Sequence, residues 1–225
     1  MKIYVDIGNT NIKYLCKDKF DDIKIIKSDI ENFKNLLNSY KNFDFVVIIT
    51  HKEKKIYIDI LRKSKVNFKI VTNKDFENNI NPNIDINEIG VDILLASKYF
   101  KSSSGLIILN GTALVSIYID NGIIQLVTLG AGTSYQNELL NRILNLNDKY
   151  NFEITNGTNT FDSICLNNYI NIFGIINYFS KKKDNLKIVL SGNNFLNQNL
   201  NDILKISNNI EVIENLVLKM LEKSF

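Results

Sequence analysis

The residues best suited to chemistry stand at the end of the first apolar run of the chain. An aspartate is followed closely by a glycine, an asparagine and a threonine: Asp6, Gly8, Asn9 and Thr10. A glycine turn lets the backbone approach an anion closely, and Asn9 and Thr10 offer neutral donors to phosphate oxygens. Phosphate would repel Asp6, so its natural use is to hold a hydrated Mg²⁺. Lys13 is within reach to neutralise phosphate charge. The alternative is an ordinary Asn-rich hairpin, because this short pattern also arises by chance.

Two later turns strengthen the functional interpretation. The first is Gly111-Thr112-Ala113, and two glycine turns in duplicated halves of a chain can clamp a nucleoside triphosphate between domains. The second is Ser191-Gly192-Asn193, which follows a short apolar strand. Taken alone, a Ser-Gly turn carries no information. As the third element in this order, it is expected to abut the nucleoside.

An acceptor hydroxyl needs a group that positions or deprotonates it, and Asp92 is the candidate. It stands in Gly90-Val91-Asp92, where a helix is expected to begin. A carboxylate is favoured there by the helix dipole, which is the purely structural explanation. The functional one is a general base for a primary alcohol. Phosphoryl transfer depends mainly on positioning and charge neutralisation, so one well-placed carboxylate would suffice.

Around these residues the hydrophobic pattern predicts an α/β protein made of two similar halves. Each half opens with strand, short turn, strand, turn and strand, then alternates with helices. Expected strands are 3–5, 12–15, 23–27, 45–50, 67–71, 106–109, 115–119, 123–129 and 187–190; expected helices are 30–40, 56–63, 91–100, 135–146, 160–179 and 211–222. The polar stretch 78–88 is expected to be a loop. The repeat places the domain boundary near Ser102–Gly105, giving domains 1–104 and 105–225.

Composition narrows the class of protein. The chain has 225 residues, is 45% hydrophobic and 23% charged, and carries a net charge of +3, with lysines and acids mixed along it. The sequence lacks the basic stripe that is typical of nucleic-acid-binding proteins. Its apolar runs are all much shorter than the roughly 18 residues of a membrane span. The two cysteines, Cys16 and Cys165, form no C-x-x-C pair with each other, which argues against structural zinc and favours a reducing compartment. We expect a cytoplasmic protein with no nucleic-acid or membrane partner.

The motifs resemble, in order, those of the type III pantothenate kinases, the Baf-like branch of the ASKHA superfamily. Asp6–Lys13 resembles the opening motif of that family, and Gly90-Val91-Asp92 resembles the start of its G-x-D-R motif. Gly111-Thr112-Ala113 resembles the end of its D-x-G-T-A motif. Weaker matches complete the order along nearly the whole chain: Asn159-Thr160, Val189–Gly192 and Glu214–Leu218.

The resemblance implies a fold of duplicated actin-like, ribonuclease H-like (ASKHA) domains, each with a mixed five-stranded sheet flanked by helices. It implies ATP-dependent phosphorylation of pantothenate to 4'-phosphopantothenate, the first step of coenzyme A biosynthesis, in a homodimer using Mg²⁺ and a monovalent cation (K⁺ or NH₄⁺). Asp92 would be the catalytic base. The ATP contacts would be Asp6, Gly8, Asn9, Thr10, Lys13, Gly111, Thr112, Ser191 and Gly192, and the pantothenate contacts Gly90, Val91, Asp92 and Thr160.

The chain departs from the family pattern at several motif positions. Ile93 replaces the arginine of G-x-D-R, so a bidentate partner for the carboxylate of pantothenate is lost. Leu109 replaces the aspartate before Gly-Thr-Ala, which removes the expected ligand of the monovalent cation, although Asn110 could offer a neutral oxygen there. The family's later threonine and aspartate fall on Val115 and Ile117.

Three hypotheses therefore stay open. The first is an active pantothenate kinase with a remodelled pocket, which rests on the retained Asp6 and Asp92. The second is a catalytically impaired member with a binding or regulatory role, which rests on Ile93, Leu109 and Ile117. The third is a kinase of another small alcohol that lacks a carboxylate, which the missing arginine favours.

Overall fold

The structure is a computed structural model that describes residues 1–16, 20–196 and 199–225. Its contacts divide the chain into two compact units. Unit 1 comprises Met1–Tyr99 together with Val217–Phe225, and unit 2 comprises Phe100–Leu216. The expected boundary near Ser102–Gly105 lies a few residues beyond this division, and the last helix is counted mainly with unit 1. The assignment of functional domains 1–104 and 105–225 stays a prediction.

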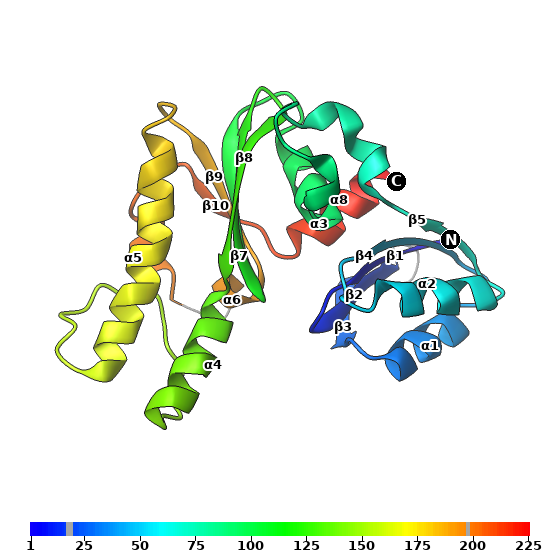
Figure 1. The fold of residues 1–225 in the computed structure, drawn as a ribbon, viewed down its shortest axis with the longest axis horizontal. Helices are drawn as coiled ribbons and strands as arrows, with labels where there is room; N and C mark the ends of the chain where they lie inside the picture. The colour runs from blue at the N-terminus through cyan, green and yellow to red at the C-terminus, as the bar shows by residue number, and fades with distance from the viewer. Residues whose placement is uncertain (17–19, 197–198) are drawn as a thin grey trace. The chain divides into compact units, whose positions relative to one another are not determined.

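Unit 1 is built on a five-stranded mixed sheet in the order β3-β2-β1-β4-β5. The strands are β1 (Lys2–Ile7), β2 (Asn11–Cys16), β3 (Phe20–Lys27), β4 (Asp44–Ile49) and β5 (Asn67–Ile70). β1 pairs antiparallel with β2 and parallel with β4, so the opening hairpin continues directly into β/α alternation. Figure 1 shows α1 (Ile30–Ser39) and α2 (Lys54–Lys63) on one face of this sheet and α3 (Val91–Ser97) on the other.

The alternation of side chains along β1 explains why α1 and α2 pack where they do. Ile3, Val5 and Ile7 point to one face and are completely buried. They share a core with residues spaced at helical intervals on the two helices: Phe33, Leu36 and Leu37 of α1, and Tyr57 and Leu61 of α2. Asp29 begins α1 by accepting a hydrogen bond from the backbone N–H of Asn32, at 2.8 Å.

Unit 2 repeats this topology with a second five-stranded sheet in the order β10-β9-β6-β7-β8. Its strands are β6 (Gly105–Asn110), β7 (Ala113–Asp120), β8 (Ile123–Ala131), β9 (Lys187–Ser191) and β10 (Ile210–Val212). β6 occupies the place of β1, with an antiparallel hairpin on one side and a parallel strand on the other. The predicted duplication of a mixed five-stranded sheet is confirmed.

The long helix α5 (Thr160–Ser180) covers the second sheet, as Figure 1 shows. Its buried residues Ile172, Ile176 and Phe179 pack with side chains of the two central parallel strands: Leu106 and Ile108 of β6, and Ile188 and Leu190 of β9.

The amphipathic helix α4 (Thr133–Leu144) buries only Thr133 and Asn137. The described residues contain no helix with the length and apolarity needed to cross a bilayer.

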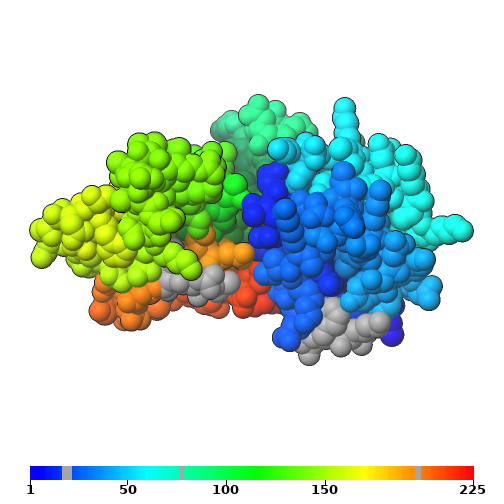
Figure 2. All heavy atoms as spheres, turned by 90° about the horizontal axis from the view of Figure 1, so that it is seen from below, coloured from blue at the N-terminus to red at the C-terminus, as the bar shows by residue number. Residues whose placement is uncertain are grey.

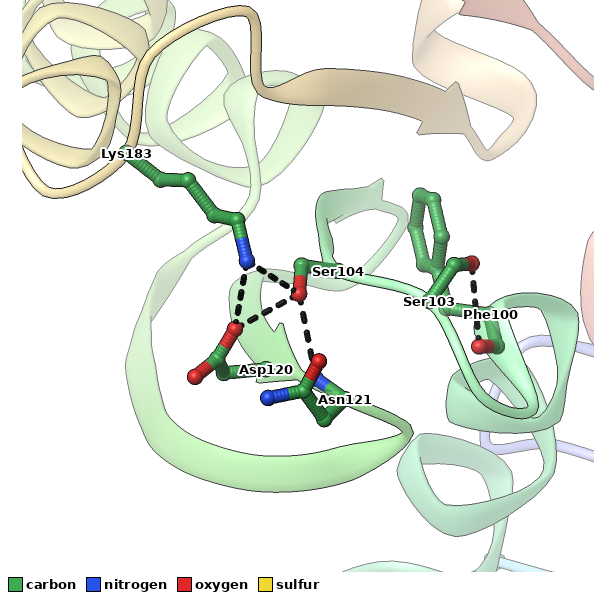
Figure 3. A network of polar contacts seen from close by, with 6 residues as sticks. All are labelled: Phe100, Ser103, Ser104, Asp120, Asn121 and Lys183. Carbon is green, nitrogen blue, oxygen red and sulfur yellow. Dashed lines mark hydrogen bonds and ion pairs between the residues drawn. The ribbon is translucent and has the colours of Figure 1, made fainter.

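The turn between β7 and β8 is tied to the segment that enters unit 2 (Figure 3). The ammonium of Lys183 lies 2.8 Å from the Asp120 carboxylate and 2.8 Å from the Ser104 hydroxyl. These contacts hold the pKa of Asp120 below its usual value. Gly122, with φ of +78°, donates its N–H to the Ser103 carbonyl at 2.9 Å, and an added Cβ there would lie 1.7 Å from the Lys101 carbonyl oxygen. Only glycine permits this approach.

Most of the elements predicted from the sequence are confirmed, and the predicted helix 211–222 is confirmed from Leu216 onward but begins too early. Ile210–Val212 forms the edge strand β10, paired parallel with β9, and helix α8 begins only at Leu216. Asn215, with φ of +50°, separates the two elements. Two short helices, α6 (Asn193–Leu196) and α7 (Asn201–Leu204), were not predicted. The expected loop 78–88 overlaps the end of the 3₁₀ turn η1 (Asn73–Asn79) and contains the 3₁₀ turn η2 (Ile86–Glu88).

Candidate functional site

The glycine turn between β1 and β2 lies at the carboxyl end of β1. Gly8 donates its N–H to the carbonyl of Asn11 at 3.1 Å, which closes the turn. Ser28, just after β3, donates its hydroxyl to the Gly8 carbonyl at 2.6 Å and its N–H to the Thr10 carbonyl at 3.0 Å. These hydrogen bonds hold the backbone of the turn against Ser28, while Asn9 and Thr10 are exposed.

The structure brings Asp6, Lys13 and Asp92 together within unit 1. Asp6 and Lys13 are directly paired in the register of β1 and β2, so their side chains leave the same face of the sheet. Asp92 lies in the first turn of α3, and its charge acts on Asp6. The sequence predicted roles for all three residues, but it gave no measure of how close they lie.

Burial and mutual repulsion make Asp6 an unusual carboxylate. Desolvation and the negative charge of Asp92 raise the pKa of Asp6 to about 7, against the opposing pull of the Lys13 ammonium. Burial also raises the pKa of Asp92, although backbone N–H groups of Ile93 and of Asp92 itself hydrogen-bond its carboxylate and act in the opposite direction. Two carboxylates in such a position favour a shared proton or a cation.

Gly90 explains how the Asp92 carboxylate reaches the start of its own helix. A Cβ added at Gly90 would lie 2.3 Å from Oδ1 of Asp92, so any larger residue would displace the carboxylate. Val91 and Ile93 point into the protein and are only 5% and 8% exposed. Two of the expected pantothenate contacts lie in this segment. Val91 could contact a ligand only through its backbone, whereas the half-buried side chain of Asp92 is partly accessible.

The corresponding turn of unit 2 lies between β6 and β7 and is centred on Gly111 and Thr112. Gly111 donates its N–H to the Ala113 carbonyl at 2.9 Å, and Gly111 and Thr112 are exposed. An added Cβ at Gly111 would meet nothing within 4 Å, so the turn is open at this point. Thr112 accepts the N–H of Gly132 at 2.9 Å, which brings the start of α4 beside the turn.

Behind this turn lies a polar cluster that the sequence analysis missed, formed by Asn110, Thr133 and Asn194. The completely buried Asn110 donates its amide to the Thr133 hydroxyl at 2.8 Å. Its Oδ1 accepts from the Thr133 N–H and from the Asn194 side chain, each at 3.1 Å. Asn194 also donates to the Gly111 carbonyl at 3.0 Å. The sequence signal that could have revealed this cluster is a glycine followed by small polar residues, which occurs after β8 and again after β9.

The cluster changes the expectation for Asn110. A carbonyl oxygen has two lone pairs, and both of those on Asn110 Oδ1 already accept hydrogen bonds. Asn110 therefore does not present a neutral oxygen for a cation, contrary to the expectation from the sequence. Leu109 supplies no ligand either, because its side chain is aliphatic.

The remaining predicted residues of unit 2 are Ser191, Gly192 and Thr160. Ser191 is buried, and its hydroxyl accepts the N–H of Leu216 at the start of α8, at 3.2 Å. Gly192 has φ of +120°, and a Cβ there would lie 2.3 Å from the Asn110 carbonyl oxygen. Thr160 is exposed in the first turn of α5, where Asn159 caps the helix by accepting the Asp162 N–H at 2.9 Å. The predicted nucleotide and pantothenate contacts of these residues stay predictions.

Comparison with solved structures shows the class of fold. A conserved protein from Campylobacter jejuni, provisionally described as a Baf family transcriptional activator, matches 98% of this chain and 96% of its own at 16% identity, with a TM-score of 0.68. MreB 5 of Spiroplasma citri bound to AMPPNP matches 99% of this chain and 95% of its own at 11% identity, with a TM-score of 0.55.

A third similar structure is the activator of the 2-hydroxyisocaproyl-CoA dehydratase from Clostridium difficile with bound ADPNP. It matches 99% of this chain and 94% of its own at 11% identity, with a TM-score of 0.51. No family model matches the sequence, and no curated protein sequence matches it. At these identities the likeness shows an actin-like fold over the whole chain, and it includes a Baf-type protein among the similar structures.

The raised pKa of Asp6 predicts a pH-dependent cost to stability. A carboxyl whose pKa is higher in the folded state stabilises the protein below its unfolded value of 3.8, and this stabilisation is lost as pH rises through about 7. In the absence of divalent cations, wild type should therefore lose on the order of 1–3 kcal/mol of unfolding free energy between pH 5 and pH 8 relative to Asp6→Asn.

Urea unfolding at both pH values measures this difference. Asp59→Asn, which changes an exposed carboxylate on α2, is the matched control and should follow the wild-type profile. Parallel pH profiles for wild type and Asp6→Asn would show that Asp6 is not desolvated in the folded protein.

Proposed function

We propose that the protein binds ATP and transfers its γ-phosphoryl group to an alcohol, with pantothenate as the acceptor. The observation that carries this proposal is the meeting of Asp6, Lys13 and Asp92 beside an exposed glycine turn in unit 1. Similar structures with bound AMPPNP or ADPNP support a nucleotide as the ligand. The Baf-type neighbour and the order of the motifs support the choice of acceptor.

The residues of unit 1 fit a hydrated Mg²⁺. In the parts of the chain that the structure describes, no three His, Cys, Asp or Glu side chains gather into a cluster that could hold a metal on their own. Mg²⁺ at nucleotide sites is usually held by one or two carboxylates together with phosphates and water. Asp6 would hold the ion through water, and the ion would offset the repulsion between Asp6 and Asp92. It would supply charge neutralisation at the phosphates.

Each protein group then has a definable part in the transfer. Gly8, Asn9 and Thr10 would take phosphate oxygens at the first turn, and Lys13 would neutralise their charge. Gly111, Thr112, Ser191 and Gly192 would complete the nucleotide contacts from unit 2. Asp92 would accept the proton of the acceptor hydroxyl, with Gly90, Val91 and Thr160 beside the acceptor.

Asp92 is favoured over Asp6 as the base by its surroundings and not by its pKa. Burial raises the pKa of both carboxyls, which suits either of them to accept a proton near neutral pH. Asp6 is paired with Lys13 in the register of β1 and β2 and lies next to the phosphate turn, so it is assigned to the phosphates and Asp92 to the acceptor. The buried Ile93 has no charge with which to bind an acceptor that carries a carboxylate. A kinase of a small alcohol without a carboxylate is therefore the second candidate function.

We expect Asp92→Asn to lower kcat with pantothenate by about 10²–10⁴-fold, because a general base contributes about that much. The KM for ATP should change little, since Asp92 is assigned to the acceptor. Coupled ADP release, with the phosphorylated product identified by mass spectrometry, measures both constants. Asp59→Asn again serves as the exposed control.

The same assay separates the alternatives. Turnover of other alcohols without turnover of pantothenate would assign a different acceptor. ATP binding without turnover on any alcohol would identify a binding or regulatory protein. Wild-type activity in Asp92→Asn would remove Asp92 from the mechanism.

We expect the activity not to depend on a monovalent cation, unlike that of the family which the sequence resembles. In unit 2 the side-chain amide of Asn194 already donates to both Oδ1 of Asn110 and the carbonyl oxygen of Gly111. ATP affinity and kcat should therefore agree within about twofold in KCl, NH₄Cl and choline chloride at equal ionic strength, since Asn110 Oδ1 is fully engaged and Leu109 has no side-chain ligand. A large loss of activity in choline chloride would show that a cation site exists elsewhere.

We also propose that the protein is a homodimer that uses the outer face of α4. Tyr135, Leu139 and Ile143 recur every four residues and are 56%, 50% and 68% exposed. Figure 2 shows the side chains of α4 and the segment after it at the surface of unit 2. Such an apolar stripe on a charged protein is typical of an interaction surface.

In light scattering, wild type should have twice the chain mass of 25.8 kDa. Ile143→Glu should weaken association about tenfold or more, which corresponds to about 1.4 kcal/mol. Ile56→Glu, at a 39% exposed isoleucine of α2, is the control. Equal masses for wild type and Ile143→Glu would move the interface away from α4.

A further inference from the structure

Asn9, at the tip of the first glycine turn, is held by a loop that the sequence analysis did not connect with it. The backbone N–H of Lys52, between β4 and α2, donates to Oδ1 of Asn9 at 2.9 Å. β1 and β4 are parallel neighbours, so the chain leaves both strands at the same edge of the sheet. This is why a residue far away in sequence can reach the turn.

The Lys52 hydrogen bond decides which end of the Asn9 amide faces outward. A backbone N–H can only donate, so it must meet the oxygen of the carboxamide and not its NH₂ group. The NH₂ group is therefore directed away from Lys52. An outward NH₂ presents two donors, which suits an anion, whereas an outward oxygen would repel one.

The loop that carries this donor is itself well fixed. Thr50 donates its N–H to the Ile7 carbonyl at 3.0 Å, and Lys54 closes a turn by donating to the His51 carbonyl at 3.0 Å. The His51 side chain is only 7% exposed, and its Nδ1 accepts the N–H of Glu53 at 3.0 Å. The Lys52 N–H is thus a preorganised group.

We propose that the backbone amide of Lys52 is a positioning group for the phosphate turn, which sets the Asn9 carboxamide with its NH₂ toward the bound anion. This inference rests on the proposed nucleotide binding and adds the means by which the turn selects an anionic ligand. Lys52 acts through Asn9 and has no contact with the ligand in this assignment. The side chain of Lys52 plays no part in it.

A proline tests the amide without removing the turn. Lys52 is the second residue of the turn closed by His51 and Lys54, and Glu53, the third, has φ of −93° and ψ of 35°. These angles are near those of a type I turn, whose second position favours proline. Lys52→Pro therefore removes the N–H donor and keeps the loop, and Lys52→Ala is the matched variant that keeps the donor and also loses the side chain.

Binding of Mg-AMPPNP and of tripolyphosphate to the full chain is measured by calorimetry in single and double variants. We expect Lys52→Pro to bind about tenfold more weakly than Lys52→Ala, because an unanchored amide loses its favoured orientation. In the Asn9→Ala background, the proline and alanine variants should bind equally. A loss that arose only from loop damage would persist in that background.

Asn9→Asp supplies a second test that does not depend on the folding of the proline variant. The aspartate still accepts the Lys52 N–H but presents a second carboxylate oxygen outward, so it should bind the anions more weakly than Asn9→Ala. Equal binding by Asn9→Asp and Asn9→Ala, or equal losses in the proline and alanine variants, would overturn the positioning role alone. Failure of wild type to bind either anion would overturn the nucleotide proposal together with it.

Discussion

The candidate site depends on one constraint, which is the parallel pairing of β1 with β4 at the centre of the first sheet. Parallel strands end at the same edge, so the turn after β1 and the loop after β4 meet there. Hydrogen bonds between the two segments then fix the tip of the turn. The pairing of β6 with β9 repeats the constraint in unit 2, where Gly192 approaches the backbone of Asn110 too closely for any other residue.

Electrostatics in unit 1 give this edge of the sheet its chemical character. Two carboxylates and one lysine lie near a turn rich in neutral donors, and the pKa values of both carboxylates are raised by burial. Stability does not explain such a pair, because desolvating like charges is costly. The arrangement suits a ligand that brings positive charge with it, such as a metal-bound polyphosphate.

Unit 2 has the same topology but a different balance of polar groups. Its turn is backed by Asn110, Thr133 and Asn194, which satisfy one another's hydrogen bonds. A closed neutral network of this kind is rigid and carries no net charge. The two halves of the duplication have thus kept one backbone plan while placing ionisable groups beside the turn of unit 1 and amides beside that of unit 2.

The strand and helix pattern, the duplication and the two glycine turns could be predicted from the sequence, because they follow from local hydrophobic periods and turn chemistry. It placed the start of the last helix too early, because Ile210–Val212 pairs with β9 as a strand and the left-handed backbone of Asn215 precedes the helix, which begins at Leu216. Three features became visible only in the folded chain: Asp6 and Asp92 share one electrostatic environment, Asn110 Oδ1 is fully engaged, and Lys52 anchors Asn9. Each of these joins segments far apart in the chain, and such contacts are set by strand order and register, which no local pattern encodes.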